Sequence, residues 1–164
     1  MPTRILPEVP LLDHITLGSF LASRFESQSE KLSDIPHPSN LKDAQKGAER
    51  LARAIRNNER IALVGDYDVD GVTSTAIVKR FFDLISYPLI TTIPNRFSDG
   101  YGVSKNVLER LDARVIFTVD NGINAIEAAE VCKDRGIDLI ITDHHTPGDS
   151  LPDAYAIINP KQSD

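Results

Sequence analysis

The chain has 164 residues, 41% of them hydrophobic and 26% charged, which predicts one globular domain with a real core. A net charge of −6 argues against a domain that binds nucleic acid by electrostatics alone, because such domains usually carry an excess of Lys and Arg. The single cysteine, Cys132, excludes an intramolecular disulfide, and no apolar run approaches the roughly 18 residues of a membrane span. We therefore expect a cytoplasmic protein that does not associate with membranes.

The first part of the chain differs in composition from the rest. Residues 1–39 carry five of the ten prolines, and we expect an irregular arm there, with one short helix around residues 17–25. From Leu41 onward, apolar residues recur three and four positions apart, which indicates one face of a helix, and Asn40 is its expected N-cap. The predicted division is an N-terminal arm, residues 1–39, and a domain formed by residues 40–164.

Five short apolar runs predict buried strands, separated by segments with the composition of helices or polar loops. The expected strands are residues 61–64, 89–93, 115–119, 139–142 and 156–158. Strands that alternate with helices predict an α/β fold with a doubly wound, mostly parallel sheet and helices on both faces. Crossovers in such a sheet are almost always right-handed, so the C-terminal ends of the parallel strands are expected to meet at one edge.

Helices are expected between these strands. Short helices are predicted at residues 104–111 and 124–135. The helix that follows the first strand contains a very apolar segment, residues 76–85, and we expect it to pack against the sheet with Phe81 and Phe82 facing the core.

Acidic and imidazole side chains follow three of the predicted strands. These side chains are Asp66, Asp68, Asp70, Asp120, Asp143, His144 and His145. Because the strand ends meet, we expect all of them to line a single rim of the sheet. Two carboxylates about 4 Å apart repel each other by roughly 4 kcal/mol at an effective dielectric constant of about 20. Either these side chains splay into water or cations hold them together, and we take the second as the hypothesis.

Carboxylate oxygens joined by imidazole suit Mn²⁺ or Mg²⁺ better than a soft metal. Two such ions about 3.5–4 Å apart orient a water, lower its pKa and neutralise charge on a phosphoryl group. The rim thus predicts a phosphoesterase. For any single aspartate the alternative is a helix N-cap, but capping explains neither three alternating aspartates nor two adjacent histidines.

Two other motifs are excluded by their spacing. The run Asp66-x-Asp68-x-Asp70-Gly71 matches the opening of an EF-hand calcium loop, but the twelfth position is Ile77 instead of an acid, and a strand precedes the loop instead of a helix. A phosphate-binding P-loop requires Gly-Lys-Ser/Thr after the first strand, and this sequence has none there.

Several segments carry a resemblance to a known family. Three of them resemble, in order, the first three motifs of the DHH phosphoesterase family: residues 65–71, 118–123 and 142–145. Three more resemble, more narrowly, the branch of that family formed by bacterial single-stranded-DNA-specific exonucleases: residues 94–102, 146–152 and 157–160. The resemblance covers about residues 40–162.

This resemblance implies a two-metal nuclease that removes nucleotides from the 5′ end of single-stranded DNA in recombination and repair, with replication or repair proteins as further partners. The implied ligands of Mn²⁺ or Mg²⁺ are Asp66, Asp68, Asp70, Asp120 and His144. Asp120 would bridge the two ions. His145 would contact the scissile phosphate. Asp143 would orient a histidine through a hydrogen bond or, as the alternative, be a buried acid that serves only its own loop.

Three other polar side chains have two interpretations each. Arg96 would pair with a substrate phosphate through its guanidinium, or form a salt bridge with Asp99. Tyr101 would stack on a base, or anchor its own loop. Ser74, near the start of the first helix, would contact phosphate, or serve as a cap.

The sequence departs from the family pattern in two ways. Val64 stands where some members of the family carry a histidine, so Asp66 would replace that ligand. The fourth metal-binding aspartate and the second domain that closes over the substrate in the resembled proteins have no counterpart here. We therefore expect the N-terminal part of a longer protein, truncated before the fourth motif, with weak activity of its own or none.

Two alternative functions remain open. The first is a DHH phosphodiesterase for short oligonucleotides or cyclic dinucleotides, and the loop of residues 94–102 favours the exonuclease branch over it. The second is a non-catalytic DHH module that binds replication proteins, and the presence of all three metal-binding motifs argues against it.

Overall fold

The structure, a computed structural model, describes residues 36–162. Residues His37–Asp164 group into one unit, which opens with a 3₁₀ helix, η2 (Pro38–Asn40). The short helix expected around residues 17–25 lies outside the described residues. The predicted division into an arm, residues 1–39, and a domain, residues 40–164, therefore stays a prediction.

Five strands form one sheet in the order β2-β1-β3-β4-β5, and every neighbouring pair is parallel. They are β1 (Ile61–Val64), β2 (Ile90–Thr92), β3 (Val115–Thr118), β4 (Asp138–Thr142) and β5 (Ala156–Ile158). The predicted doubly wound parallel sheet is confirmed. Because β1 lies between β2 and β3, the strand order reverses direction at β1. Open α/β sheets bind their ligands at such a switch point, outside the C-terminal ends of the strands.

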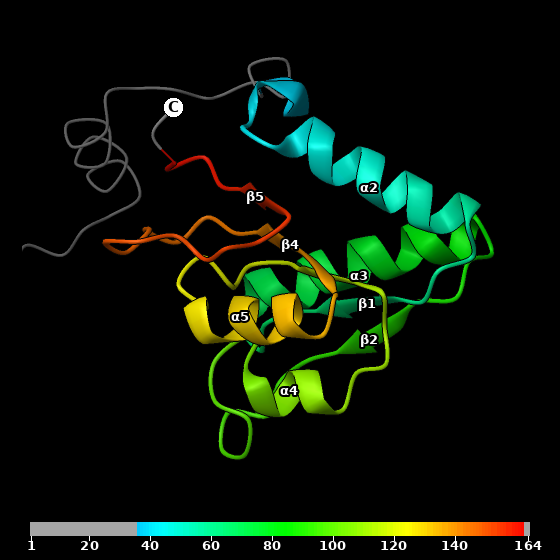
Figure 1. Cartoon of the computed structure of the whole chain (residues 1–164). Helices are drawn as coiled ribbons and strands as arrows, with labels where there is room; N and C mark the ends of the chain where they lie inside the picture. The colour runs from blue at the N-terminus through cyan, green and yellow to red at the C-terminus, as the bar shows by residue number, and fades with distance from the viewer. Residues whose placement is uncertain (1–35, 163–164) are drawn as a thin grey trace, which may run out of the picture. The chain divides into compact units, whose positions relative to one another are not determined.

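Helices cover both faces of this sheet (Figure 1). On one face lie α2 (Ala44–Arg56) and α3 (Val69–Leu84), and on the other lie α4 (Lys105–Glu109) and α5 (Ile126–Asp134). Successive strand residues alternate between the faces, so Leu63 packs toward α2 and α3 while Val64 packs toward α4 and α5. Burial on both sides explains why β1 is apolar at every position and why β3 and β4 contain the apolar runs 115–117 and 139–141.

The helix α2 begins later than expected. Its N-cap is Asp43, whereas Asn40 ends the preceding 3₁₀ helix, so the predicted cap was wrong. Asp43 has a left-handed φ of 59° and its side chain makes no capping bond. Its Oδ2 instead accepts a hydrogen bond from the backbone N–H of Ile157 in β5, at 3.0 Å. A contact between distant parts of the chain thus fixes where α2 starts.

The expectation for the apolar helix α3 was half wrong. Phe82 is 3% exposed and stacks on Phe117, with 6.1 Å between the ring centroids. Phe81, however, is 54% exposed, and Ile77 and Leu84 are exposed as well. The sheet covers only a narrow stripe of α3, so the apolar composition of a helix overstates how much of it is buried.

The short helices α4 and α5 lie inside the ranges predicted for them. Ser104 caps α4, because its Oγ accepts a hydrogen bond from the N–H of Val107 at 3.4 Å. Within residues 36–162, no helix combines the length and the apolar character that crossing a bilayer requires.

Candidate metal centre

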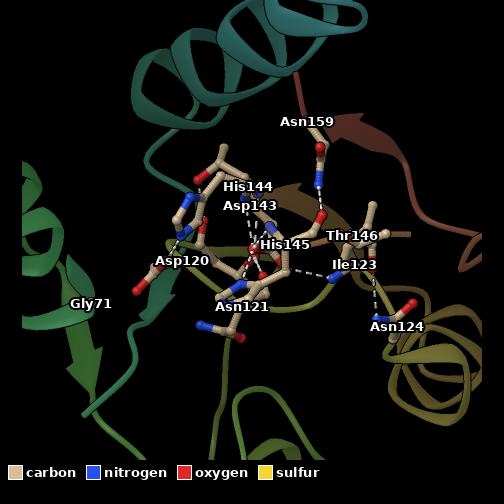
Figure 2. A network of polar contacts seen from close by, with 12 residues as sticks. Gly71, Asp120, Asn121, Ile123, Asn124, Asp143, His144, His145, Thr146 and Asn159 are labelled. Carbon is tan, nitrogen blue, oxygen red and sulfur yellow. Dashed lines mark hydrogen bonds and ion pairs between the residues drawn. The ribbon is translucent and has the colours of Figure 1, made fainter. Parts of the chain in front are cut away.

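The ends of β1, β3 and β4 bring predicted ligands together. Two sets of three residues place one ligand atom each within 4.8 Å of the others: Asp66 and Asp68 with Asp120, and His144 and His145 with Asp120. Asp120 belongs to both sets, and Figure 2 shows it facing His144 across the end of the sheet. Five of the seven side chains predicted for the rim belong to these sets. The other two lie beside them, since Asp143 faces Nδ1 of His145 and Asp70 lines a hollow together with Asp120.

Asp120 is the buried centre of this arrangement. Its Oδ1 lies 2.9 Å from Nε2 of His144, while its Oδ2 is buried and has no hydrogen-bond partner among residues 36–162. Burial raises the pKa of Asp120, and the adjacent Asp68 carboxylate raises it further. A buried carboxylate oxygen without a donor is costly. A divalent cation would satisfy it, so the residues present fit a metal ion.

The loop after β1 is tightly built around Asp66. Asp68 caps α3, since its Oδ1 accepts the N–H of Gly71 at 2.9 Å, and this bond lowers the pKa of Asp68. Capping uses one carboxylate oxygen and leaves the other for a ligand. Asp66 is buried and accepts the N–H of Tyr67 at 2.7 Å. A Cβ at Gly71 would lie only 2.5 Å from the Cβ of Asp66, so the close approach of α3 requires glycine.

Asp143 organises the two histidines. Its Oδ1 accepts the N–H groups of His144 at 2.7 Å and His145 at 3.1 Å, and lies 2.7 Å from Nδ1 of His145; its Oδ2 accepts the N–H of Ile123 at 2.9 Å. Burial opposes ionisation, but these hydrogen bonds bring the pKa of Asp143 below its ordinary value. An ionised carboxylate only accepts, so Nδ1 of His145 carries the hydrogen. The bond to Asp143 raises the pKa of His145.

Asp70 lies apart from both sets of ligand atoms. It occupies the first turn of α3 and lines an open hollow of about 400 Å³ together with Ser74, Asp120 and His144. Its role as a ligand stays a prediction. Ser74 does not cap α3, because Asp68 does.

The loop of residues 94–102 excludes one of the two interpretations of Arg96, the salt bridge with Asp99. Asp99 accepts hydrogen bonds from the N–H of Asn95 at 2.9 Å and pairs with Arg110 at 2.8 Å, so it is not the partner of Arg96. The Arg96 guanidinium lies 5.7 Å from the centroid of the Tyr67 ring and forms no ion pair within the part of the chain that the structure describes. Its charge is therefore available to an anion.

Tyr101 joins the same loop to the histidines. Its hydroxyl lies 3.4 Å from the carbonyl oxygen of Asp120 and 3.5 Å from the ring nitrogens of His145. Its ring meets Tyr67 and His145 edge to face. Burial, followed by the carboxylates of the centre, raises the pKa of Tyr101, so the phenol stays neutral. Tyr101 thus anchors its loop and still presents a half-exposed ring beside His145.

Asparagine side chains that sequence reasoning missed hold the surrounding loops. Asn121 is fully buried; its Nδ2 donates to the carbonyls of Val64 at 3.1 Å and Val119 at 2.9 Å, and its Oδ1 accepts the N–H of Val103 at 2.9 Å. It therefore ties the ends of β1 and β3 to the loop of Tyr101. Two further asparagines of this kind are Asn124 and Asn159. Asn121 and Asn159 stand just after a strand, as the acids do, and that position was the available signal, whereas Asn124 lies further on, in the loop before α5.

Comparison with known proteins identifies the class that this sheet and its rim define. Residues 60–164, which contain all five strands and every residue of the candidate metal centre, match the DHH family, N-terminal domain. The chain belongs to the DHH family. The resemblance inferred from its motifs is confirmed.

Within this family the chain is similar to the single-stranded-DNA-specific exonuclease RecJ. It is 42% identical over 135 residues to RecJ of Bacillus subtilis (strain 168), covering 80% of this chain and 17% of that protein. It is 46% identical over 128 residues to RecJ of Escherichia coli (strain K12), covering 76% of this chain and 22% of that protein. The chain thus spans about a fifth of the length of these curated relatives, between 17% and 22%.

A solved structure shows the same fold. The crystal structure of exonuclease RecJ bound to manganese matches with a TM-score of 0.68 and 37% sequence identity, over 73% of this chain and 31% of that one. The parallel sheet and its connections are therefore those of the DHH fold in RecJ.

Proposed function

We propose that this chain is the N-terminal catalytic part of a RecJ-like exonuclease that hydrolyses phosphodiester bonds from the 5′ end of single-stranded DNA, in recombination and repair. One observation carries the proposal: Asp120 belongs to both sets of ligand atoms and holds a buried oxygen that has no donor among residues 36–162. The identity of 42% to 46% with RecJ of two bacteria supports the substrate class.

The carboxylates of Asp66, Asp68 and Asp120 would hold one divalent ion, and Asp120 with His144 would hold a second. Mn²⁺ or Mg²⁺ suits these oxygen and imidazole ligands, and a related RecJ structure is described as bound to manganese. When bound, such ions polarise a phosphoryl oxygen and activate a water for attack on phosphorus.

The remaining side chains would bind and orient the phosphate. The bond to Asp143 fixes the Nδ1–H form of the His145 ring and leaves Nε2 for an oxygen of the scissile phosphate. The guanidinium of Arg96 would pair with a neighbouring phosphate. Because the whole chain carries a net charge of −6, the bound ions and the Arg96 guanidinium would offset negative charge where a DNA phosphate binds.

The experiment is a digestion of single-stranded DNA. The chain is incubated with a 5′-phosphorylated oligonucleotide, with and without Mn²⁺, and the products are separated by size. We expect slow release of nucleotides from the 5′ end that requires Mn²⁺ and that Asp120→Asn abolishes. The matched control is Asp112→Asn. Asp112 is an exposed carboxylate that precedes β3, and it pairs with Arg60, which precedes β1.

Two results would contradict the proposal. Equal activity of Asp120→Asn and Asp112→Asn would show that the reaction does not depend on the candidate metal centre. Hydrolysis of a cyclic dinucleotide without any digestion of the oligonucleotide would favour the alternative phosphodiesterase.

A further inference from the structure

The segment that carries the two histidines is held by side chains instead of by its own backbone. We call residues 143–148 the histidine turn. Within the described part of the chain, the backbone groups of residues 144–148 form no backbone–backbone hydrogen bond. Three side chains take their place: Asp143 from inside the turn, and Asn124 and Asn159 from outside it.

Asn159 makes the contact nearest to the histidine rings. It directly follows β5, is 2% exposed, and donates from Nδ2 to the carbonyl oxygen of His145 at 2.9 Å (Figure 2). Its Oδ1 accepts the N–H of Lys161 at 2.7 Å. Because both ends of the carboxamide are engaged, its orientation is fixed. A buried amide is rigid when both ends are paired and costly when one end is freed.

The contacts of His145 come from two directions. Asp143 receives its backbone N–H and faces its Nδ1, while Asn159 donates to its carbonyl oxygen. Asp143 opens the turn and is itself anchored, because its N–H donates to the carbonyl oxygen of Ile158 and its Oδ2 accepts the N–H of Ile123. Asn159 extends from the end of β5, which pairs with β4, so it attaches the turn to the sheet at a second point, the carbonyl oxygen of His145.

Asn124 holds the far side of the turn. Its Oδ1 accepts the N–H of Gly148 at 2.7 Å, and its Nδ2 donates to the carbonyl oxygen of Thr146 at 3.3 Å. These bonds keep the turn in place without contacting either histidine. Loss of Asn159 is therefore expected to disturb the histidines more than the fold.

We propose that Asn159 is a positioning residue: by fixing the backbone of His145 against the sheet, it sets the His145 ring on Asp143 and the His144 ring on Asp120. The inference rests on the proposed function in one respect, that these rings serve a metal centre acting on phosphate. Replacing a residue that orients a metal ligand through a hydrogen bond typically lowers metal affinity or activity by about 10- to 100-fold.

The test uses the full chain and two variants. Asn159→Leu keeps the approximate volume and removes both hydrogen bonds, whereas Asn159→Asp keeps the acceptor for Lys161 and removes only the donor. In metal-free protein, ¹⁵N NMR of the imidazoles at a pH above the raised pKa of His145 reports which ring nitrogen carries hydrogen. We expect the Nδ1–H form of His145 in the wild type and its loss in both variants.

Titration calorimetry with Mn²⁺ alone gives the second readout. We expect Asn159→Leu to bind Mn²⁺ about tenfold more weakly than the wild type. The matched control is Ile157→Ala, which removes buried apolar volume from β5, the strand that Asn159 follows, and leaves the side-chain hydrogen bonds of Asn124 and Asn159 to the turn in place. It should lower the melting temperature and leave both the ring form and the Mn²⁺ affinity unchanged.

Two outcomes would overturn the role of Asn159. One is that both Asn159 variants keep the Nδ1–H form and bind Mn²⁺ as the wild type does. The other is that Ile157→Ala changes both readouts as strongly, which would mean that only stability is involved. A wild type that binds no Mn²⁺ would instead refute the proposed function, and the ring form would still decide whether Asn159 positions His145.

Discussion

Asp120 and His144 join a buried carboxylate to a solvent-exposed imidazole, with 2.9 Å between Oδ1 and Nε2. The second oxygen of Asp120 is buried without a hydrogen-bond donor in residues 36–162, and the carboxylate of Asp68 lies close by. The protein therefore concentrates negative charge where it also removes water. Such a site is least favourable when empty of cations.

Replacing Asp120 should separate two effects of its charge: lower stability of the metal-free protein and stabilisation by bound Mn²⁺. Mn²⁺ is expected to raise the melting temperature of the wild type, by the equivalent of about 2.7 kcal/mol at a concentration of about 100 times the dissociation constant. Asp120→Asn should remove that gain, and without metal it should be at least as stable as the wild type, because one carboxylate is gone. Thermal melts with and without Mn²⁺ check both parts. A shift of equal size in the variant would show that the ion binds elsewhere.

Gly71 should tolerate no side chain. Alanine usually stabilises a helix relative to glycine by up to about 1 kcal/mol. At Gly71, however, the added Cβ would lie 2.5 Å from the Cβ of Asp66 and 2.6 Å from its backbone. We expect Gly71→Ala to destabilise the protein by roughly 1 to 3 kcal/mol and to weaken the effect of Mn²⁺.

Gly47 provides the matched control for this prediction. A Cβ there would meet Cδ1 of Ile158 at 3.0 Å, which is the end of a flexible side chain. Gly47→Ala should therefore cost much less than Gly71→Ala in urea unfolding and leave the Mn²⁺ effect intact. If the two substitutions have the same effect, the close approach of α3 to Asp66 does not explain why position 71 requires glycine.

The pair of Asp99 and Arg110 should make stability depend on acid. Arg110, with a further contribution from the N–H of Asn95, lowers the pKa of Asp99 to about 2, from an ordinary value of 3.8. A lowered pKa contributes stability above the ordinary value, and this contribution is lost as the pH falls through the window from 3.8 to about 2. Arg110→Gln should lower the urea midpoint at neutral pH, and the difference from the wild type should narrow inside that window. A difference that stays constant would exclude this pair as its source.

The neighbours Phe81 and Phe82 should differ sharply in their contributions to the free energy of unfolding. Phe82 is buried against Phe117, so Phe82→Ala should cost roughly 3 to 5 kcal/mol of unfolding free energy. Phe81 is exposed, so Phe81→Ala should change it by less than about 0.5 kcal/mol. Chemical denaturation of both variants measures the contrast. A large loss for Phe81→Ala would mean that this face of α3 is covered in solution.

The strands and the rim could be predicted because one physical rule covers both. A parallel strand with both faces buried needs apolar residues throughout, so β1, β3 and β4 stand out as short continuous runs. Parallel direction then brings the next polar residues to one edge, which is how Asp120 and His144 come together.

Other features depend on where a helix starts, and composition does not fix that. The alternation of Asp66, Asp68 and Asp70 suggests one shared side only if the chain stays extended. The helix α3 begins at Val69, so Asp70 already follows the helical period and lies outside both sets of ligand atoms. Composition also does not fix which side of α3 faces the sheet, and for this reason the prediction that Phe81 is buried was wrong.

The structural roles of uncharged amide side chains are still harder to predict from the sequence. Asn121 and Asn159 carry no charge to suggest a site, and each acts through backbone carbonyls that the sequence does not display. Only the position directly after Asp120 in the first case, and directly after β5 in the second, sets them apart.

The hydrogen bond from Ile157 to Asp43 spans 114 positions of the chain. A ribosome makes Asp43 early and Ile157 late, so the first turn of α2 must wait for β5 before it can settle. Contacts of such long separation are slow to form, because the loop between them must close first. The helix α2, which is synthesised before the other described α-helices, is thus expected to dock last, and a nascent chain that stops short of β5 should leave it exposed to proteases.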